Sequence, residues 1–295
     1  MRLDPVSLKL YVSVVERGSI AAAAEDGHIA AAAVSKRISE LEAILRTPLL
    51  KRTNKGVQPT PAGMALLNPA RRLLSDLDDI VAEMRDWSGG VRGQVRVFAN
   101  ISAITQFLPR EIAAFLKRHP QIQLHLQERI SSAIVKALIE NETDVGIGVP
   151  ESSLAALETF PYHDDELVLI APRGHPLARR RSLAFADALD FDFVGLHTGS
   201  SINLQLVKAS LAAGRGLRVR IQVTSYDALA RMVEAGLGIG VMPRSAAQAL
   251  LGSLGVAIVK LTDSWSKRQL VIWVRDYDAL PVAARMLVDS LRAPG

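Results

Sequence analysis

The fold of the first part of the chain is decided by residues 19–45, which read SIAAAAEDGHIAAAAVSKRISELEAIL. Ser19 is a suitable N-cap for a short helix from Ile20 to Glu25, and Asp26-Gly27-His28 predicts a turn. A second helix is predicted from about Ala31 to Leu45, because its apolar residues recur at helical spacing. Two short helices joined by a tight turn that contains glycine are typical of a helix-turn-helix.

The flanking segments extend this motif to a winged domain of residues 1–60. Pro5 opens a preceding helix, which Gly18 ends. Downstream, Leu49–Arg52 and Val57–Thr60 read as two short strands around a polar turn. A basic hairpin after a helix-turn-helix is a wing, which can lie along phosphates or reach into a minor groove. We therefore expect an all-α winged helix-turn-helix domain.

Positive charge is concentrated in this domain. The net charge of the whole chain is only +5, but residues 34–55 hold six basic residues against Glu40 and Glu42, a local net charge of +4. Such a cluster fits a polyanion, although a solvated helix face would explain the charge equally well. The basic residues are Lys36, Arg37, Arg46, Lys51, Arg52 and Lys55.

Residues 61–89 predict a long helix with an unbroken heptad seam, since its apolar residues step alternately by four and three. Its place between a basic domain and a larger one favours a dimerisation helix over a helix packed on its own domain. Pro69 lacks a backbone donor, so we expect a kink near residues 65–69. Gly89-Gly90 marks the end of the helix. The seam consists of Leu66, Ala70, Leu73, Leu77, Ile80, Met84 and Trp87.

Between residues 91 and 295, strand and helix patterns alternate, which predicts α/β subdomains with parallel sheets. One helix is expected from about Ala103 to Arg118, and one strand at Leu167–Ile170. The acidic run Asp164-Asp165-Glu166 before that strand is expected to be a solvated turn rather than a metal site. Ligands of such folds lie beyond the carboxyl ends of strands, often between two subdomains.

Several polar residues stand where predicted strands lead into predicted helices. Free amides and a partial positive dipole at helix starts can hold a carboxylate, so together these residues favour a small, anionic ligand. Each serine taken singly is as well explained by ordinary capping, and no arginine clamp is evident. The candidates are Asn100, Ser102, Ser131, His197, Thr198, Ser200, Ser201 and Tyr226.

Other site chemistries find little support in the sequence. The chain has no cysteine, which excludes disulfides, thiolate zinc sites and cysteine nucleophiles. Its six histidines lack metal-ligand spacing, and phosphate-binding or serine-hydrolase motifs are missing. We expect no metal, no cofactor and no enzymatic activity. The chain also lacks an apolar run long enough for a bilayer and a secretory signal, so we expect a cytoplasmic protein without a membrane partner.

Across residues 1–293 the chain resembles the LysR-type transcriptional regulators. The resemblance rests on a co-linear set of short motifs, each of which is weak alone. They are Ala21–Glu25 with His28-Ile29, Val34–Ile38 with Leu41-Glu42, Leu49–Thr53, Thr60–Gly63, Leu108-Pro109 through His119-Pro120, Asp144–Ile147, His175–Leu177, and Val233–Ile239 with Pro243.

The resemblance implies a multidomain protein that binds double-stranded promoter DNA and responds to a small-molecule effector. It implies a linker helix that pairs two subunits, a homotetramer built as a dimer of dimers, and a two-lobed α/β effector domain similar to periplasmic binding proteins. The lobes would span about 91–162 with 267–295, and about 163–266. By motif position, DNA would be contacted by Ala31, Ala32, Ser35, Lys36 and Arg37 on the recognition helix and by Arg52 and Lys55 in the wing.

The sequence departs from the family pattern at the recognition helix. Where the family often has Ser-Gln-Pro, this chain has Ala30-Ala31-Ala32, which removes a helix cap and an amide able to read adenine. Altered base readout is expected at these positions. One alternative also stays open: a cytosolic small-molecule binding protein or enzyme whose N-terminal helices serve only oligomerisation.

Overall fold

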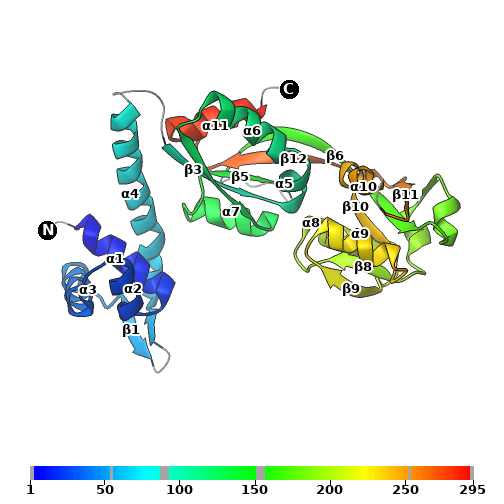
Figure 1. Ribbon diagram of the computed structural model, residues 1–295. Coiled ribbons are helices and arrows are strands. Elements are labelled where there is room, and N and C mark those ends of the chain that lie inside the picture. Colours follow the sequence, from blue (N-terminus) through cyan, green and yellow to red (C-terminus); the bar gives the residue numbers. More distant parts are fainter. Residues whose placement is uncertain (1–2, 54–55, 87–92, 151–156, 252–253, 293–295) are drawn as a thin grey trace. The chain divides into compact units, whose positions relative to one another are not determined.

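The computed structural model describes residues 3–53, 56–86, 93–150, 157–251 and 254–292 (Figure 1). The chain divides into two compact units, an N-terminal unit that ends at Arg92 and a C-terminal unit that begins at Gly93. Among the described residues, none of the helices is both long and apolar enough to cross a membrane.

The N-terminal unit is a three-helix core with a hairpin and a long helix. Asp4 and Ser19 cap the first two helices through their side chains, whereas Ala30 before α3 has no side chain able to do so. Leu8 and Tyr11 of α1 pack in one core with Val34 and Ile38 of α3. The elements are α1 (Pro5–Arg17), α2 (Ile20–Asp26), α3 (Ala31–Leu45), β1 (Leu50–Thr53), β2 (Gly56–Pro59) and α4 (Pro61–Asp86).

The long helix α4 is continuous from Pro61 to Asp86, with Pro69 inside it. Its first turns belong to the N-terminal core, where Leu67 and Ala70 are buried. Further along, Leu73, Leu77 and Ile80 are exposed apolar side chains. The helix therefore anchors its start in its own unit and carries an uncovered apolar stripe beyond it.

The C-terminal unit is built on one mixed sheet that runs through two lobes. Its strand order is β4-β3-β5-β12-β6-β11-β7, with β10 also paired to β6, and β8 and β9 form a separate parallel pair. The elements of lobe I are β3 (Gly93–Ala99), α5 (Ile101–Gln106), α6 (Leu108–Arg118), β4 (Ile122–Glu128), α7 (Ser131–Ile139), β5 (Val145–Gly148), β12 (Lys267–Val274) and α11 (Val282–Arg292). Those of lobe II are β7 (Ser182–Leu183), β8 (Phe193–Leu196), α8 (Ser201–Ala212), β9 (Val219–Val223), α9 (Tyr226–Glu234), β10 (Gly240–Pro243), α10 (Arg244–Leu251) and β11 (Val256–Leu261).

The lobes share strand β6 (Glu158–Pro172), whose first part pairs with β12 and whose last part pairs with β10 and β11. The pairing with β12 continues to Glu166 and Lys267. The acidic run at 164–166 therefore lies inside a strand, and the expectation of a solvated turn is wrong. Asp165 is buried there because an arginine on β12 compensates its charge.

The helix expected from Ala103 to Arg118 is also corrected, because the structure has two helices that meet at Phe107. Pro109 explains the break. It has no N–H to continue the α5 ladder, and its ring suits the first turn of a new helix. α5 is thus a short helix that begins directly after Asn100, and Asn100 is its N-cap.

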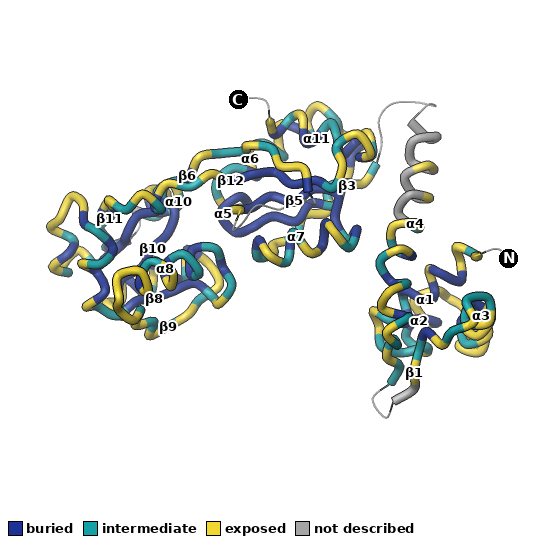
Figure 2. The backbone as a smooth tube through the Cα atoms, turned by 180° about the vertical axis from the view of Figure 1, so that it is seen from behind, coloured by how far each residue is buried: buried dark blue, intermediate teal, exposed yellow. Residues whose placement is uncertain are grey.

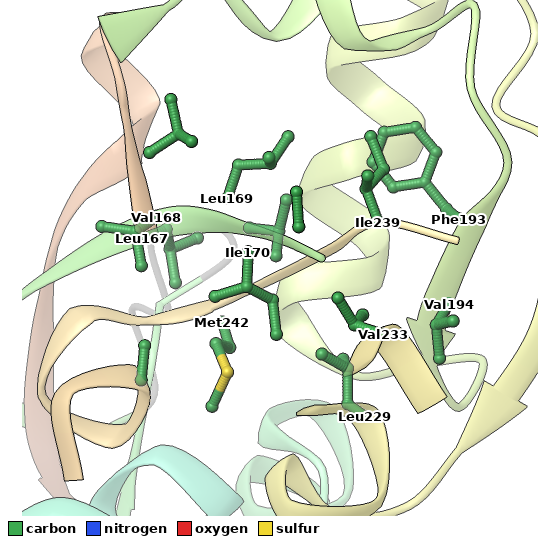
Figure 3. Packing of buried hydrophobic residues seen from close by; sticks show 14 of the residues in the cluster. Leu167, Val168, Leu169, Ile170, Phe193, Val194, Leu229, Val233, Ile239 and Met242 are labelled. Atoms are coloured by element: carbon green, nitrogen blue, oxygen red, sulfur yellow. The ribbon is translucent and has the colours of Figure 1, made fainter. Parts of the chain in front are cut away.

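Each lobe has its own apolar core. In lobe II, Leu167–Ile170 of β6 pack against Leu229 and Val233 of α9, Phe193 of β8 and Met242 of β10 (Figure 3). In lobe I, Trp273 of β12 is 1% exposed and packs with Ile134 and Leu138 of α7. Strands β3, β5 and β12 of lobe I are largely buried, whereas α3 of the N-terminal unit shows an exposed outer surface (Figure 2).

Candidate DNA-binding surface and effector cleft

The outward face of α3 is set by its buried face. Val34, Ile38 and Leu41 point into the core at helical spacing, so Ala32 and Lys36 fall on the opposite side. The Lys36 side chain is 78% exposed, and its Nζ lies 3.9 Å from a carboxylate oxygen of Glu40 one turn later. An exposed pair of this kind contributes little, so the ammonium is available to a phosphate or a base.

The other predicted DNA contacts differ in their surroundings. Ala31 and Ala32 are exposed and Ser35 is half-buried. Arg37 Nη1 donates to Asp4 Oδ2 at 2.7 Å, which ties α3 to the N-cap of α1. The sequence motif gave no sign of this ion pair, because the two residues are far apart in the chain.

The wing is an antiparallel hairpin in which Arg52 of β1 pairs in register with Val57 of β2. The hairpin is fixed to α1, because Val57 N donates to Gly18 O at 2.9 Å. Lys55 lies outside the described residues. The structure thus brings a helix surface and a strand hairpin together around one core, as the sequence predicts for a winged helix-turn-helix.

In the C-terminal unit, a cleft of about 360 Å³ lies where the two lobes face each other. Its walls combine apolar side chains with a few polar ones, which is typical of small-molecule sites. Six of the eight predicted ligand residues line it. They are Asn100, Ser131, His197, Ser200, Ser201 and Tyr226.

The two remaining candidates stand apart from this lining. Ser102 is buried behind the cleft, where its Oγ lies 2.9 Å from the hydroxyl of Tyr226. Thr198 is exposed, and its hydroxyl lies 3.5 Å from Gln222 Oε1. Gly199, directly after Thr198 in the chain, adopts φ +91°, and a Cβ there would lie 3.1 Å from Ile130 of lobe I. Glycine at this position therefore allows the close approach of the lobes.

Polar groups at the cleft are held in fixed positions. Asn100 Oδ1 accepts from Ala103 N at 3.0 Å, and Ser200 Oγ accepts from Asn203 N at 3.2 Å. Ser131 Oγ accepts from Val149 N at 3.3 Å. Burial raises the pKa of Tyr226 to about 12, so its hydroxyl stays neutral. Among the described residues, His197 Nδ1 is a buried atom without a hydrogen-bond partner.

An arginine behind the cleft was missed by the sequence reasoning. Arg268 of β12 forms an ion pair with Asp165, with 2.6 Å between Nη2 and Oδ2. It also donates to Ser102 and Ser201, which come from different lobes. Nothing in the sequence indicated that Arg268 lies near the cleft, because ligand residues were expected where strands lead into helices, and Arg268 stands at the start of a strand. Other lining residues that were missed are Ile101, Glu128, Arg129, Ile130, Ala133, Leu196 and Ile202.

Comparison with known proteins accounts for both units. Residues 6–64 match the family model described as bacterial regulatory helix-turn-helix protein, lysR family, and residues 88–294 match the LysR substrate binding domain. The chain belongs to the LysR family of transcriptional regulators. It is therefore a DNA-binding transcriptional regulator with an effector-binding domain, and not an enzyme. The alternative of an oligomerisation-only N-terminal domain is set aside.

Individual relatives agree with this LysR-type assignment. The RuBisCO operon transcriptional regulator of Allochromatium vinosum is 30% identical over 243 residues, covering 82% of this chain and 80% of the relative. The structure of full-length CbnR with its target DNA shares the fold, with a TM-score of 0.70, 23% identity, and coverage of 98% of this chain and 99% of that one. A full-length OxyR variant from Pseudomonas aeruginosa gives a TM-score of 0.76 at 21% identity, covering 99% and 95%.

Proposed function

We propose that this LysR-type regulator contacts the major groove with the outward face of α3 and the phosphate backbone with its wing. Lys36 carries the proposal, because its ammonium is exposed at the centre of that face. Ser35, Arg37, Arg52 and Lys55 complete the basic and polar contacts. Ala31 and Ala32 lie at the groove by position and offer only methyl groups.

The salt dependence of binding tests these assignments. We would measure fluorescence anisotropy with a duplex taken from upstream of the regulator's own gene, at roughly 50 to 200 mM salt. Wild-type binding should weaken steeply with salt because counterions are released from neutralised phosphates. Glu25→Gln is the control for substitutions on α3 such as Lys36→Ala, since Glu25 is an exposed residue of α2 rather than of α3. Binding that is insensitive to salt would contradict the proposal.

We also propose that α4 pairs two subunits along its heptad seam and that paired dimers form a homotetramer. Leu73, Leu77 and Ile80 support this assignment, since they are 41%, 37% and 55% exposed on one helix. Leu66 and Ala70 contribute to the N-terminal core, so they would support the seam from its anchored end. The Met84 side chain and Trp87 lie outside the described part of the chain. Because promoter DNA is its partner, we place the protein in the cytoplasm.

For the cleft, we propose a small anionic effector. Two helices longer than two turns begin at its wall, α7 at Ser131 and α8 at Ser201, so their unpaired amides and partial positive charges can hold a carboxylate or phosphate. Arg129 and Glu128 both line the cleft and their charges offset each other, so the preference for an anion rests on the two helix starts. Asn100, Ser102, His197, Thr198, Ser200 and Tyr226 complete the proposed site.

Thermal-shift measurements with a panel of small acids and their uncharged amides test the effector class. A true effector should raise the melting temperature of the C-terminal unit by an amount that grows with the logarithm of its concentration, because it binds the folded state alone. The paired amide should have less effect. Stabilisation by amides but not by acids would contradict an anionic effector.

A further inference from the structure

One side chain contacts both lobes of the effector domain at once. Arg268 Nη2 donates to Ser102 Oγ of lobe I at 2.7 Å, and Arg268 Nη1 donates to Ser201 Oγ of lobe II at 3.2 Å. Arg268 itself lies on β12, opposite Asp165 of β6, where the chain passes between the lobes. A planar guanidinium presents its donors in a fixed fork, so both hydroxyls are held in one geometry.

The charge of this arginine is compensated inside the protein. Asp165 Oδ2 accepts from Arg268 Nε at 2.9 Å and from Nη2 at 2.6 Å. The Arg268 and Asp165 side chains are 9% and 3% exposed. A buried pair of this kind keeps its geometry well, because any separation would leave a charge without water or a partner. The pair is thus a fixed support for the two serines.

A second hydrogen bond joins the lobes at the same point. The hydroxyl of Tyr226, at the start of α9 in lobe II, lies 2.9 Å from Ser102 Oγ of lobe I. Tyr226 and Ser102 are 4% and 1% exposed, so water cannot replace this contact while the lobes stay in place. Tyr226 and Ser201 also line the cleft, which means that a molecule in the cleft would touch the groups that join the lobes.

We propose that Ser102, Asp165, Ser201, Tyr226 and Arg268 form an interlobe latch, which fixes the angle between the lobes. The biological role of this latch, which is to control the effector site, rests on the proposed function. An effector then acts by rearranging the latch, and it can shift the lobes only by its difference in affinity for the latched and unlatched forms.

The latch can be opened without removing its charged pair. The double variant Ser201→Ala/Tyr226→Phe deletes the two hydrogen bonds of the latch to lobe II and leaves the Arg268–Asp165 pair intact. The Tyr226–Ser102 bond joins two hydroxyls and is worth a few-fold in the equilibrium between joined and separated lobes, whereas the Arg268–Ser201 bond has a charged donor and is worth more. Their joint loss should raise the separated population by at least roughly tenfold. Tyr277→Phe is the matched control, because Tyr277 bonds Asp289 within lobe I.

Spin labels can measure the lobe separation directly, since the chain has no cysteine of its own. The exposed Val282 of α11 and Gln248 of α10, one in each lobe, would be changed to cysteine and labelled. Labelled chains would be mixed with excess unlabelled chains, so that each oligomer carries one pair of spins. Double electron–electron resonance then gives the distance distribution of the full-length, effector-free protein.

We expect one narrow distribution for the wild type and for Tyr277→Phe, and a broader one that extends to longer distances for the double variant. A broad wild-type distribution, or a double variant that matches the wild type while keeping its circular dichroism, would overturn the latch. The measurement uses neither DNA nor effector, so a failure of the proposed DNA-binding or effector function would appear in other assays and leave this result interpretable.

Discussion

Replacing Arg268 by methionine should destabilise the effector domain far more than loss of an ordinary ion pair. The substitution leaves the Asp165 carboxylate, 3% exposed, without its 2.6 Å partner. Removing one member of a buried pair costs about 3–5 kcal/mol, because the remaining charge stays desolvated. The exposed pair Arg231–Asp227, whose side chains are 62% and 56% exposed, serves as the control. Arg231→Met should cost less than about 1 kcal/mol.

Urea unfolding followed by tryptophan fluorescence measures these costs. Trp265 and Trp273 both belong to the C-terminal unit, and Trp273 is 1% exposed in its core. With a slope of about 2–3 kcal/mol per molar urea, the midpoint of Arg268→Met should fall by roughly 1–2 M. The double variant Asp165→Leu/Arg268→Met should recover most of the loss, since it removes both charges. A double variant as unstable as Arg268→Met would refute the reasoning.

Three further predictions concern DNA binding, assembly and pH. Lys36→Ala and Arg52→Ala should each reduce the slope of log affinity against log salt by about one, measured by anisotropy; an unchanged slope would place them away from phosphates. Leu77→Glu should lower the particle mass in light scattering, whereas Met64→Glu, exposed on α4 outside the seam, should not; equal masses would contradict the seam. Burial raises the pKa of Tyr226 from 10 to about 12, so the wild type should lose about 3 kcal/mol more stability than Tyr226→Phe between these pH values in urea unfolding. Parallel losses would show that this hydroxyl does not titrate differently on folding.

The winged helix-turn-helix could be predicted because its local signals agree with its packing. The helix predicted from Ala31 to Leu45 has the same bounds in the structure, and Ser19 caps the helix that it was expected to cap. Short-range patterns suffice here, since caps, turns and apolar spacing act over a few residues. The tie between Arg37 and Asp4 could not be predicted, because it depends on how two helices cross.

The cleft was predictable for the opposite reason, because many strand ends converge at one edge of an α/β fold. Asn100 and Ser200 each follow a strand and precede a helix, and Ser131 begins the helix after β4, so topology alone brings them together. Arg268 and Asp165 escaped because they meet across two antiparallel strands far apart in sequence. The same separation in sequence explains why a solvated turn was wrongly predicted at 164–166. A run of acidic residues suggests exposure to solvent until the strand that pairs with it is known.

Strands β6 and β12 carry a mechanical consequence. Within the described part of the chain, they pass between the lobes as neighbours, paired from Glu158–Val274 to Glu166–Lys267 with a shift of register between Gln269 and Val271. Sliding one strand along the other would break this register, whereas bending or twisting the ribbon as a whole preserves it. Relative motion of the lobes is thereby limited to bending and twisting of this two-stranded ribbon. Effectors of different shape would therefore produce the same kinds of lobe movement and would differ only in its extent.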